Sequence, residues 1–541
     1  MNIQDLNRLS IPIADLRTLR EENKIYVDKT DMVADLASYD NAFFLSRPRR
    51  FGKSLLLSTF AELFQNGLKS FSGLYAEKKW SDVKIYPVIF LTFSSYTREN
   101  IRIFKNDFSI DLKMQFYHAF PDLRNLAIPQ DLPPNLLLAF FLKNISGKKV
   151  VVLIDEYDTP ITHTMDRKEF QYAIIQNLAS FFTVLKQYSY KCRFIFITGI
   201  TKIAHLSLFS DVNFITDITF DDRYASIVGI SEKECIQYYD AYVSNAAQEL
   251  GMSVSTVYRS LQSNYDGYCF SPNAVDTVYA PWSLLSFLRA PSLGFRNYWY
   301  ESGGTPTILI NYLKDVQNSY PDKINSREQI EEISIDNLIL KSNLDNIPIN
   351  ILLLQTGYFT IKKIDLFTLG LCLPNKEVSD SLFLLNMYIQ KRALTIDTKN
   401  RIMNIPYMID KECFQDIVEL FSAILIECVS PKSNIFENEI SIRDIIYLMI
   451  PEKLLRKSRE NPNAFGYSDL ELSTESTTLC IEFKRSYPGK TDIRALNEGI
   501  KQCHERKYAL GSHRVCHIVM VVSTKKRLIT TWKRVDTIDL S

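Results

Sequence analysis

Residues 44–54 read FLSRPRRFGKS and end in the Gly-Lys-Ser of a phosphate-binding loop. In such a loop, backbone N–H groups at a helix N-terminus surround the phosphates, the lysine reaches the outer phosphates and the serine hydroxyl binds Mg²⁺. Lys53 and Ser54 would take these two roles. The consensus has glycine where this chain has Arg47, so the tight turn must be made in another way. The stretch indicates a nucleotide site, although a lone Gly-Lys-Ser also occurs at solvated helix starts.

The residues on either side of this stretch fit a strand and a helix in the order that a phosphate-binding loop requires. Residues 42–45 are a short apolar run, which predicts a buried strand, and residues 54–64 place apolar side chains at helical spacing. Context therefore favours the nucleotide site. Its candidate ATP-binding residues in this stretch are Arg47, Pro48, Arg49, Arg50, Phe51, Gly52, Lys53, Ser54 and Leu55.

A second acidic element follows at residues 150–156, which read VVVLIDE. Consecutive aliphatic residues before two carboxylates predict a strand that is buried on both faces and delivers Asp155 and Glu156 at its C-terminal end. Asp155 would hold Mg²⁺, directly or through water, and Glu156 would polarise the attacking water. An acidic turn after a core strand is the alternative interpretation.

Strand-like runs alternate with helical stretches through the first part of the chain, at residues 88–93, 150–154 and 194–198. This rhythm predicts an α/β fold with a largely parallel sheet covered by helices. Thr198 ends the third run, where its hydroxyl could bind the nucleotide and sense the terminal phosphate; an ordinary strand threonine is the alternative. The charge on the transferred phosphate could be stabilised by Arg49, Arg50 and Arg223. Arginines on the surface without a catalytic role are commoner, which is the alternative.

Composition sets wide limits on function. The chain has 541 residues, 46% of them hydrophobic, which is enough for about three or four domains. Its 63 basic and 62 acidic residues give a net charge of +1, so any nucleic-acid surface must be a local patch. The 9 cysteines form no Cys-x-x-Cys pair, which favours reduced core residues of a cytoplasmic protein. The chain also shows no signal-like N-terminus and no membrane-spanning apolar run, so we expect no membrane partner.

A second chemical cluster lies near the C-terminal end, in residues 466–484. If residues 467–472 and 479–484 form a hairpin, strand alternation places Glu482 and Lys484 on one face, where Asp469 on the neighbouring strand meets them. The two carboxylates would hold Mg²⁺ beside a scissile phosphate, and Lys484 would orient or help deprotonate a water. Glu-x-Lys on an amphipathic edge strand is also ordinary surface chemistry, which is the alternative.

The elements around this cluster have a defined order. Residues 440–450 predict a helix before the hairpin, and an apolar stripe at Ile493, Leu496, Ile500 and Cys503 predicts a helix after it. Residues 515–522 then predict a strand. The expected order is helix, strand, strand, helix, strand.

These motifs resemble those of the bacterial AAA-ATPase-like proteins that carry a PD-(D/E)XK nuclease-like domain at the C-terminus. The residues that carry the resemblance are 26–30 (YVDKT), 47–55 (RPRRFGKSL), 153–158 (LIDEYD), 198–202 (TGITK), 265–268 (YDGY), 281–285 (PWSLL), 298–299 (YW) and 354–358 (LQTGY). The resemblance covers nearly the whole chain, and arginine is common in that family where the first loop glycine would be.

The resemblance implies three domains: an AAA-like P-loop ATPase domain in residues 1–230, a helical lid and winged-helix-like region in residues 231–400, and a restriction-endonuclease-like α/β domain in residues 401–541. It implies that Asp469, Glu482 and Lys484 match the nuclease triad. By the same resemblance, Glu439, near the start of the predicted helix, supplies a further metal ligand, and Glu437 is the alternative. Acids near a helix start also stabilise the helix dipole without binding metal.

Two functional hypotheses follow. The first is a cytoplasmic protein that binds and hydrolyses ATP and whose Mg²⁺-dependent nuclease-like domain cuts DNA or RNA. The second is a regulatory switch or scaffold, in which ATP rearranges the lid and the C-terminal domain binds nucleic acid or protein without cutting it. A simple small-molecule kinase is disfavoured by the long C-terminal half of the chain.

Overall fold

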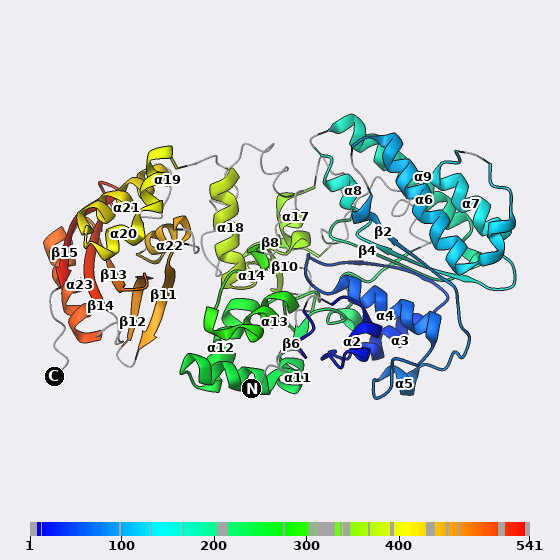
Figure 1. Ribbon diagram of the computed structural model, residues 1–541, viewed down its shortest axis with the longest axis horizontal. Coiled ribbons are helices and arrows are strands. Elements are labelled where there is room, and N and C mark those ends of the chain that lie inside the picture. The colour runs from blue at the N-terminus through cyan, green and yellow to red at the C-terminus, as the bar shows by residue number, and fades with distance from the viewer. Residues whose placement is uncertain are drawn as a thin grey trace. The chain divides into compact units, whose positions relative to one another are not determined.

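The chain forms two compact units in the computed structural model, Met1–Phe383 and Leu384–Ser541 (Figure 1). The structure describes residues 8–11, 13–96, 99–129, 131–165, 167–202, 215–273, 276–301, 309, 330–335, 338, 347–365, 368–389, 394–428, 439–450, 454–463, 466–506 and 514–535. No helix in these ranges is both long and apolar enough to cross a membrane.

The first unit is built on a five-stranded sheet in the order β2-β3-β4-β1-β5, and every neighbouring pair is parallel. The strands are β1 (Ala42–Ser46), β2 (Val88–Thr92), β3 (Val150–Asp155), β4 (Cys192–Gly199) and β5 (Thr216–Asp217). Strands β1, β3 and β4 are buried along their whole length, as their continuous apolar runs predict. The predicted parallel sheet is therefore confirmed.

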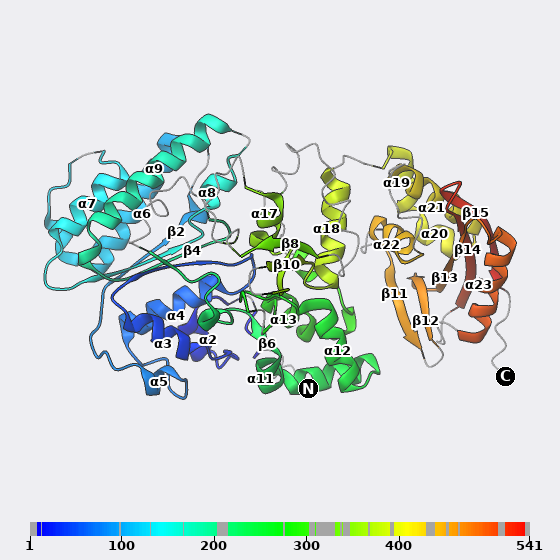
Figure 2. The same cartoon turned by 180° about the vertical axis from the view of Figure 1, so that it is seen from behind.

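Helices cover both faces of this sheet. Figures 1 and 2 show α6, α7 and α9 on one side and α2, α3 and α4 on the other. Their bounds are α2 (Leu16–Glu21), α3 (Thr30–Ser38), α4 (Lys53–Asn66), α6 (Ile101–Ala119), α7 (Pro134–Asn144) and α9 (Lys168–Gln187). The shorter helices are α5 (Ala76–Lys79), α8 (Thr159–Thr162), η1 (Phe93–Ser95), η2 (Pro121–Asn125), η3 (Ser189–Lys191) and η4 (Asp222–Tyr224).

The covering helices are amphipathic in the way their sequences predict. In α6, for example, Phe104, Phe108, Leu112 and Phe116 recur every fourth residue and are all fully buried. The side chain of Asn100 accepts a hydrogen bond from the Ile103 N–H and so caps the start of this helix.

The strand order indicates which end of the sheet is expected to bind a ligand. After β1 the chain passes through α4 to β2, which lies at the far edge beyond β4 and β3. The loop between β1 and α4 therefore opens beside the carboxyl ends of β4 and β3, where open α/β sheets bind their ligands.

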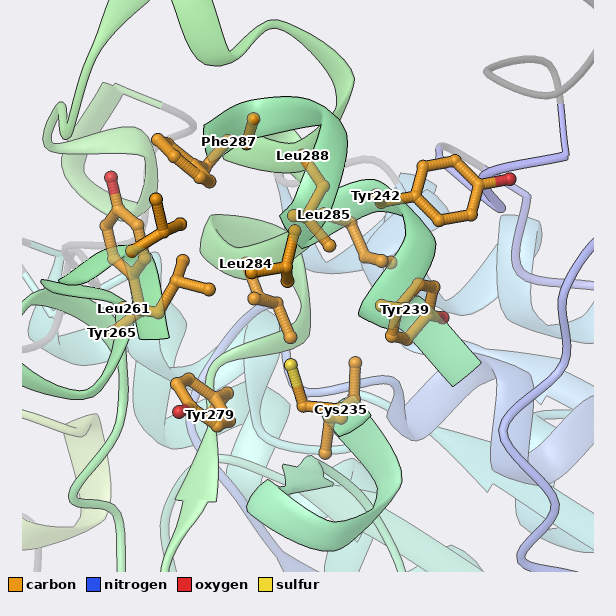
Figure 3. Packing of buried hydrophobic residues seen from close by; sticks show 14 of the residues in the cluster. Cys235, Tyr239, Tyr242, Leu261, Tyr265, Tyr279, Leu284, Leu285, Phe287 and Leu288 are labelled. Carbon is orange, nitrogen blue, oxygen red and sulfur yellow. The ribbon is translucent and has the colours of Figure 1, made fainter. Parts of the chain in front are cut away.

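The remainder of the first unit begins with a helical cluster around α11 (Glu232–Leu250), α12 (Val254–Tyr265) and α13 (Pro281–Arg289). The side chains of Ser231 and Glu234 form a reciprocal capping box at the start of α11. Tyrosine, leucine and phenylalanine side chains from the three helices pack into one core, shown in Figure 3. The short pair β6 (Ile230–Ser231) and β7 (Val278–Tyr279) lies in the same region of the chain.

A small antiparallel sheet follows, in the order β8-β10-β9. Its strands are β8 (Glu331–Ser334), β9 (Thr360–Lys363) and β10 (Thr368–Cys372). The neighbouring helices are η5 (Pro291–Leu293), α14 (Tyr298–Glu301), α17 (Ile349–Thr356) and α18 (Lys376–Ile389). The winged-helix-like character of this region stays a prediction.

The second unit contains a five-stranded sheet in the order β11-β12-β13-β14-β15. Only β13 and β14 pair in parallel, through the crossover helix α23. The elements are α19 (Ile396–Met403), α20 (Ile405–Asp410), α21 (Phe414–Cys428), α22 (Glu439–Met449), β11 (Arg456–Asn463), β12 (Gly466–Ser473), β13 (Thr477–Ser486), α23 (Asp492–Arg506), β14 (Arg514–Ser523) and β15 (Leu528–Val535). The expected order of helix, two strands, helix and strand is present, with one more strand at each edge.

Candidate functional site

The phosphate-binding stretch forms a loop between β1 and α4. Gly52 caps α4 with a φ of 92°, and Arg50 also has a positive φ, of 68°. The helix begins at Lys53, so its first backbone N–H groups point into the loop. These unpaired donors, together with the helix dipole, make this end of α4 favourable for an anion.

The Lys53 side chain is folded into the loop. Its ammonium donates hydrogen bonds to the carbonyls of Arg47, at 2.9 Å, and Pro48, at 2.8 Å, and the residue is only 6% exposed. Burial lowers the pKa of the Lys53 ammonium, and the nearby carboxylates, of which Asp155 has the largest influence, oppose this shift.

Ser54, Asp155 and Thr198 meet at the carboxyl end of the sheet. The Ser54 hydroxyl donates to Asp155 Oδ2 at 2.6 Å, and the Thr198 hydroxyl donates to Asp155 Oδ1 at 2.6 Å. Asp155 is 4% exposed and ends β3, while Thr198 lies near the end of the adjacent β4. The structure thus brings together the two predicted metal ligands, Ser54 and Asp155, and orients the carboxylate from both sides.

Glu156 follows directly after this carboxylate. Its backbone has a φ of 52°, in the left-handed region that non-glycine residues rarely adopt. The side chain is half-buried, and among the residues that the structure describes we find no hydrogen bond or ion pair to its carboxylate. Glu156 is therefore held at the site through its backbone.

The guanidinium of Arg47 is buried and bound to backbone carbonyls of the first unit. Arg47 is 1% exposed and donates to the carbonyls of Ser46, Thr219 and Tyr224 at 2.9, 2.6 and 3.3 Å. The group also lies 4.1 Å from the ring centre of Phe270. Burial lowers the pKa of Arg47 to about 9. The arginine that replaces the loop glycine therefore links the loop to two distant segments of the same unit.

The rest of the loop also packs against later parts of the first unit. Phe51 is fully buried, and its ring centre lies 4.7 Å from that of Tyr268 and 5.5 Å from that of Phe270. Pro48 lies so close to Gly357 that a Cβ at position 357 would be 2.7 Å from the proline ring. Gly357 has a φ of 88°, so glycine is favoured there for two independent reasons.

The loop arginines contact two tryptophans. The Trp299 indole N–H donates to the carbonyl of Arg49 at 3.3 Å, and the guanidinium of Arg50 lies 4.6 Å from the ring centre of Trp282. The Arg49 side chain reaches His163 Nε2 at 3.1 Å. Arg223, in contrast, is exposed and paired with Asp221 at 2.6 Å.

An apolar pocket with a volume of about 90 Å³ lies beside the start of α4. It is lined by Ser10, Ile25, Tyr26, Val27, Lys29, Phe51, Gly52, Leu55, Leu56, Thr59, Ile227, Val228, Gly229, Ile230, Tyr239, Pro281 and Leu285. Lys29, at its wall, forms a largely buried ion pair with Glu234 at 2.6 Å. This pocket could not be predicted from the sequence, because its walls come from six separate segments of the chain. The YVDKT motif at residues 26–30 was its one signal in the sequence.

The predicted cluster of the second unit lies on neighbouring strands. The Lys484 ammonium contacts Glu482 Oε1 at 2.6 Å, and the two residues are 9% and 1% exposed. In the hairpin, Leu470 pairs with Ile481, and Asp469 and Glu482 are the residues directly next to this pair on their two strands. Asp469 Oδ2 accepts a hydrogen bond from the Phe483 N–H at 2.8 Å. The three side chains predicted to converge therefore belong to adjacent positions of one sheet.

The metal predictions for this cluster stay untested. Glu439 is the first residue of α22, which packs against β11, β12 and β13, but its side chain and the alternative Glu437 lie outside the described residues. Within the described ranges, no group of three or more His, Cys, Asp or Glu residues is arranged to hold a metal ion. The contacts that the structure does establish for this cluster are the ion pair of Glu482 with Lys484 and the hydrogen bond from the Phe483 N–H to Asp469.

Comparison with known proteins bears on the N-terminal part. Residues 10–209 match the AAA-ATPase-like family, which is described as "Predicted AAA-ATPase". A relative from Azotobacter chroococcum mcd 1, named "Uncharacterized protein in vnfD 5'region", is 27% identical over 512 residues, covering 93% of each chain. The matched residues include the loop, Asp155, Glu156 and Thr198, so the chain carries a predicted AAA-ATPase-like domain at its N-terminus.

Proposed function

We propose that this protein binds ATP at residues 47–55 and hydrolyses it with Glu156 as the residue that polarises the attacking water. The observation that carries the proposal is the meeting of Ser54, Asp155 and Thr198 beside the buried ammonium of Lys53. Phosphoryl transfer needs positioning and charge stabilisation more than covalent chemistry, and these are the groups that supply both.

Each residue has one task in this scheme. The N–H groups at the start of α4 and the Lys53 ammonium bind the phosphates. The Ser54 hydroxyl and the Asp155 carboxylate are oxygen donors of the kind that Mg²⁺ prefers, and they would hold the ion, which neutralises phosphate charge when bound. Glu156 accepts a hydrogen bond from the water that attacks the terminal phosphorus, with ADP as the leaving group. Thr198 keeps the Asp155 carboxylate oriented.

The apolar pocket supports a nucleotide rather than a phosphate ion as the ligand. It adjoins Gly52 and Leu55 at the start of α4, and Tyr26 and Tyr239 are among its lining residues. A flat, weakly polar purine ring would gain from apolar and aromatic contact with such walls, and the pocket of about 90 Å³ would have to widen to admit it. We propose adenine as the base because residues 10–209 match the AAA-ATPase-like family.

Lys53→Met tests the ATP site. The methionine keeps the aliphatic volume but removes the ammonium, so we expect ATP affinity, measured by isothermal titration calorimetry with Mg²⁺, to fall about 10- to 100-fold. Lys69→Met, at an exposed position after the end of α4, is the matched control and should bind ATP as the wild type does. Unchanged ATP affinity in Lys53→Met would refute the site.

We also propose that the second unit cleaves phosphodiester bonds with Mg²⁺, and one observation favours it over a non-cleaving switch. Asp469 and Glu482 lie directly next to the last paired residues of the β12–β13 hairpin, Leu470 and Ile481, and Lys484 lies on the same face of β13 as Glu482. The two carboxylates suit Mg²⁺ as oxygen donors, and the ammonium stabilises the negative charge that develops on the phosphate. The alternative is an ATP-dependent switch or scaffold in which this unit binds nucleic acid or protein without cutting it.

Asp469→Asn tests this second activity. Asparagine keeps an oxygen that can accept from the Phe483 N–H, so the hairpin stays folded while one negative charge is lost. We expect cleavage of DNA or RNA in the presence of Mg²⁺ to drop by about 10²-fold or more, and EDTA to abolish it. Glu475→Gln, in the exposed hairpin turn, is the control. If the wild-type protein cuts neither DNA nor RNA, the switch is the better account.

A further inference from the structure

Asp158 is a buried carboxylate that the proposed reaction does not use. The residue is 1% exposed, and its Oδ2 accepts three hydrogen bonds, from the Ile200 N–H at 3.1 Å and from the N–H and hydroxyl of Thr201, both at 2.8 Å. Its Oδ1 is buried and has no hydrogen-bond partner in the described part of the chain. Burial raises the pKa of this carboxyl group. Burying a carboxylate with one oxygen unpaired costs free energy, so a structural or functional role is expected for Asp158.

Tyr157, the residue before Asp158, also binds the segment at the end of β4. It is fully buried, its N–H donates to the Thr198 carbonyl at 3.1 Å, and its hydroxyl donates to the Thr201 carbonyl at 2.7 Å. Tyr157 and Asp158 therefore hold residues 198–201, at the end of β4, through both backbone and side-chain hydrogen bonds. We call these two residues the 157–158 anchor.

Gly199 is what allows the anchor to come so close to β4. A Cβ at this position would lie 2.6 Å from the ring of Tyr157 and 2.9 Å from Asp158 Oδ1. Such distances are not tolerated between real atoms, so any other residue would push the anchor away from the strand.

The anchor fixes the backbone of Glu156. On one side of Glu156, Asp155 is held by Ser54 and Thr198; on the other side, the anchor is held by residues 198–201. With both neighbours fixed, Glu156 takes its left-handed conformation, with a φ of 52°. A conformation this unfavourable persists only when the surrounding structure enforces it, and such residues cluster at functional sites.

We propose that Tyr157 and Asp158 are positioning residues that aim the Glu156 carboxylate at the attacking water by holding its backbone in the left-handed conformation. The inference rests on the proposed ATP hydrolysis and adds the residues that make Glu156 effective. In this scheme the anchor acts on hydrolysis by fixing the backbone of Glu156.

The kinetic test compares Asp158→Ala with Asp158→Asn. Alanine removes the acceptor of all three hydrogen bonds, so Glu156 loses its fixed direction and kcat for ATP hydrolysis should fall by about 10²-fold, as for a misplaced reacting group. The ATP affinity should change little, because Lys53 keeps its hydrogen bonds to the Arg47 and Pro48 carbonyls, and Ser54 and Asp155 keep their contact. Asparagine keeps an accepting oxygen and places its NH₂ where Oδ1 has no partner, so Asp158→Asn should retain most of the wild-type rate.

Tyr157→Phe is the milder variant for use if Asp158→Ala does not fold. It removes only the hydrogen bond to the Thr201 carbonyl, and we expect a smaller loss of kcat, again with unchanged ATP affinity. If kcat and ATP affinity fall together in these variants, or if kcat does not fall in either, the anchor has no positioning role.

A stability test separates this inference from the proposed function, since it needs no ATP hydrolysis. Glycine tolerates a positive φ better than alanine, so Glu156→Gly should melt at a higher temperature than Glu156→Ala. In an Asp158→Ala background the backbone is released, and this difference should shrink. An equal difference in both backgrounds overturns the anchor alone. If the wild-type protein binds ATP but does not hydrolyse it, the proposed function is wrong, and the anchor then has no role in catalysis.

Discussion

Glu156→Gln should lower kcat for ATP hydrolysis by about 10²- to 10⁴-fold while leaving ATP binding intact, because glutamine has the shape of glutamate but not its basicity. The left-handed backbone at this position is retained, since the two side chains have the same steric demand at φ 52°. The rate should be measured as phosphate release at saturating ATP and Mg²⁺, and the affinity by calorimetry.

Glu169→Gln is the matched control for this prediction. Glu169 is exposed in the first turn of α9, so the same change there should leave hydrolysis at the wild-type rate. Wild-type hydrolysis by Glu156→Gln would instead show that another group activates the water.

Arg47→Gly should destabilise the protein, although it restores the glycine of the consensus loop. The change leaves the carbonyls of Thr219 and Tyr224 without the donor they have in the structure and removes the group that covers Phe270. Unsatisfied buried carbonyls cost about 1–3 kcal/mol each, so we expect the free energy of unfolding to fall by about 3 kcal/mol or more. Urea unfolding followed by tryptophan fluorescence measures this loss as a lower midpoint.

The same substitution at Arg50 is the control. Arg50 is exposed and has a φ of 68°, so glycine relieves backbone strain there while losing the contact with Trp282. These effects oppose each other, and the change in unfolding free energy should stay within about 1 kcal/mol. Equal midpoints for Arg47→Gly and Arg50→Gly would contradict the structural role of Arg47.

The central sheet of the first unit could be predicted because parallel strands are buried on both faces. The apolar runs at residues 88–93, 150–154 and 194–198 became β2, β3 and β4 with small changes at their ends. The edge strands β11 and β15 of the second unit could not be read in the same way. β11 is rich in charged residues and contains Pro462, and β15 is only partly buried, which is typical of strands with one free edge.

The candidate site was predictable where chemistry and chain order coincide. Asp155 is the last residue of β3 and Thr198 the second-last residue of the adjacent parallel strand β4, so their contact follows once the sheet is predicted correctly. The partners of Arg47 lie far along the chain, and no local pattern connects them with the loop. The 157–158 anchor could not be predicted for a different reason: the sequence shows an acid at Asp158, but only the structure shows that it is buried and bound to Ile200 and Thr201.

Phe51 packs against Tyr268 and Phe270, and Pro48 packs against Gly357. Because of these contacts, the AAA-ATPase-like domain cannot be moved into another protein without later parts of the chain. A gene fusion that carried only the first 230 residues to another protein would expose an aromatic ring at the base of the loop. A transfer that keeps the loop intact must therefore carry the downstream aromatic and glycine partners as well, all of which lie within the compact unit Met1–Phe383.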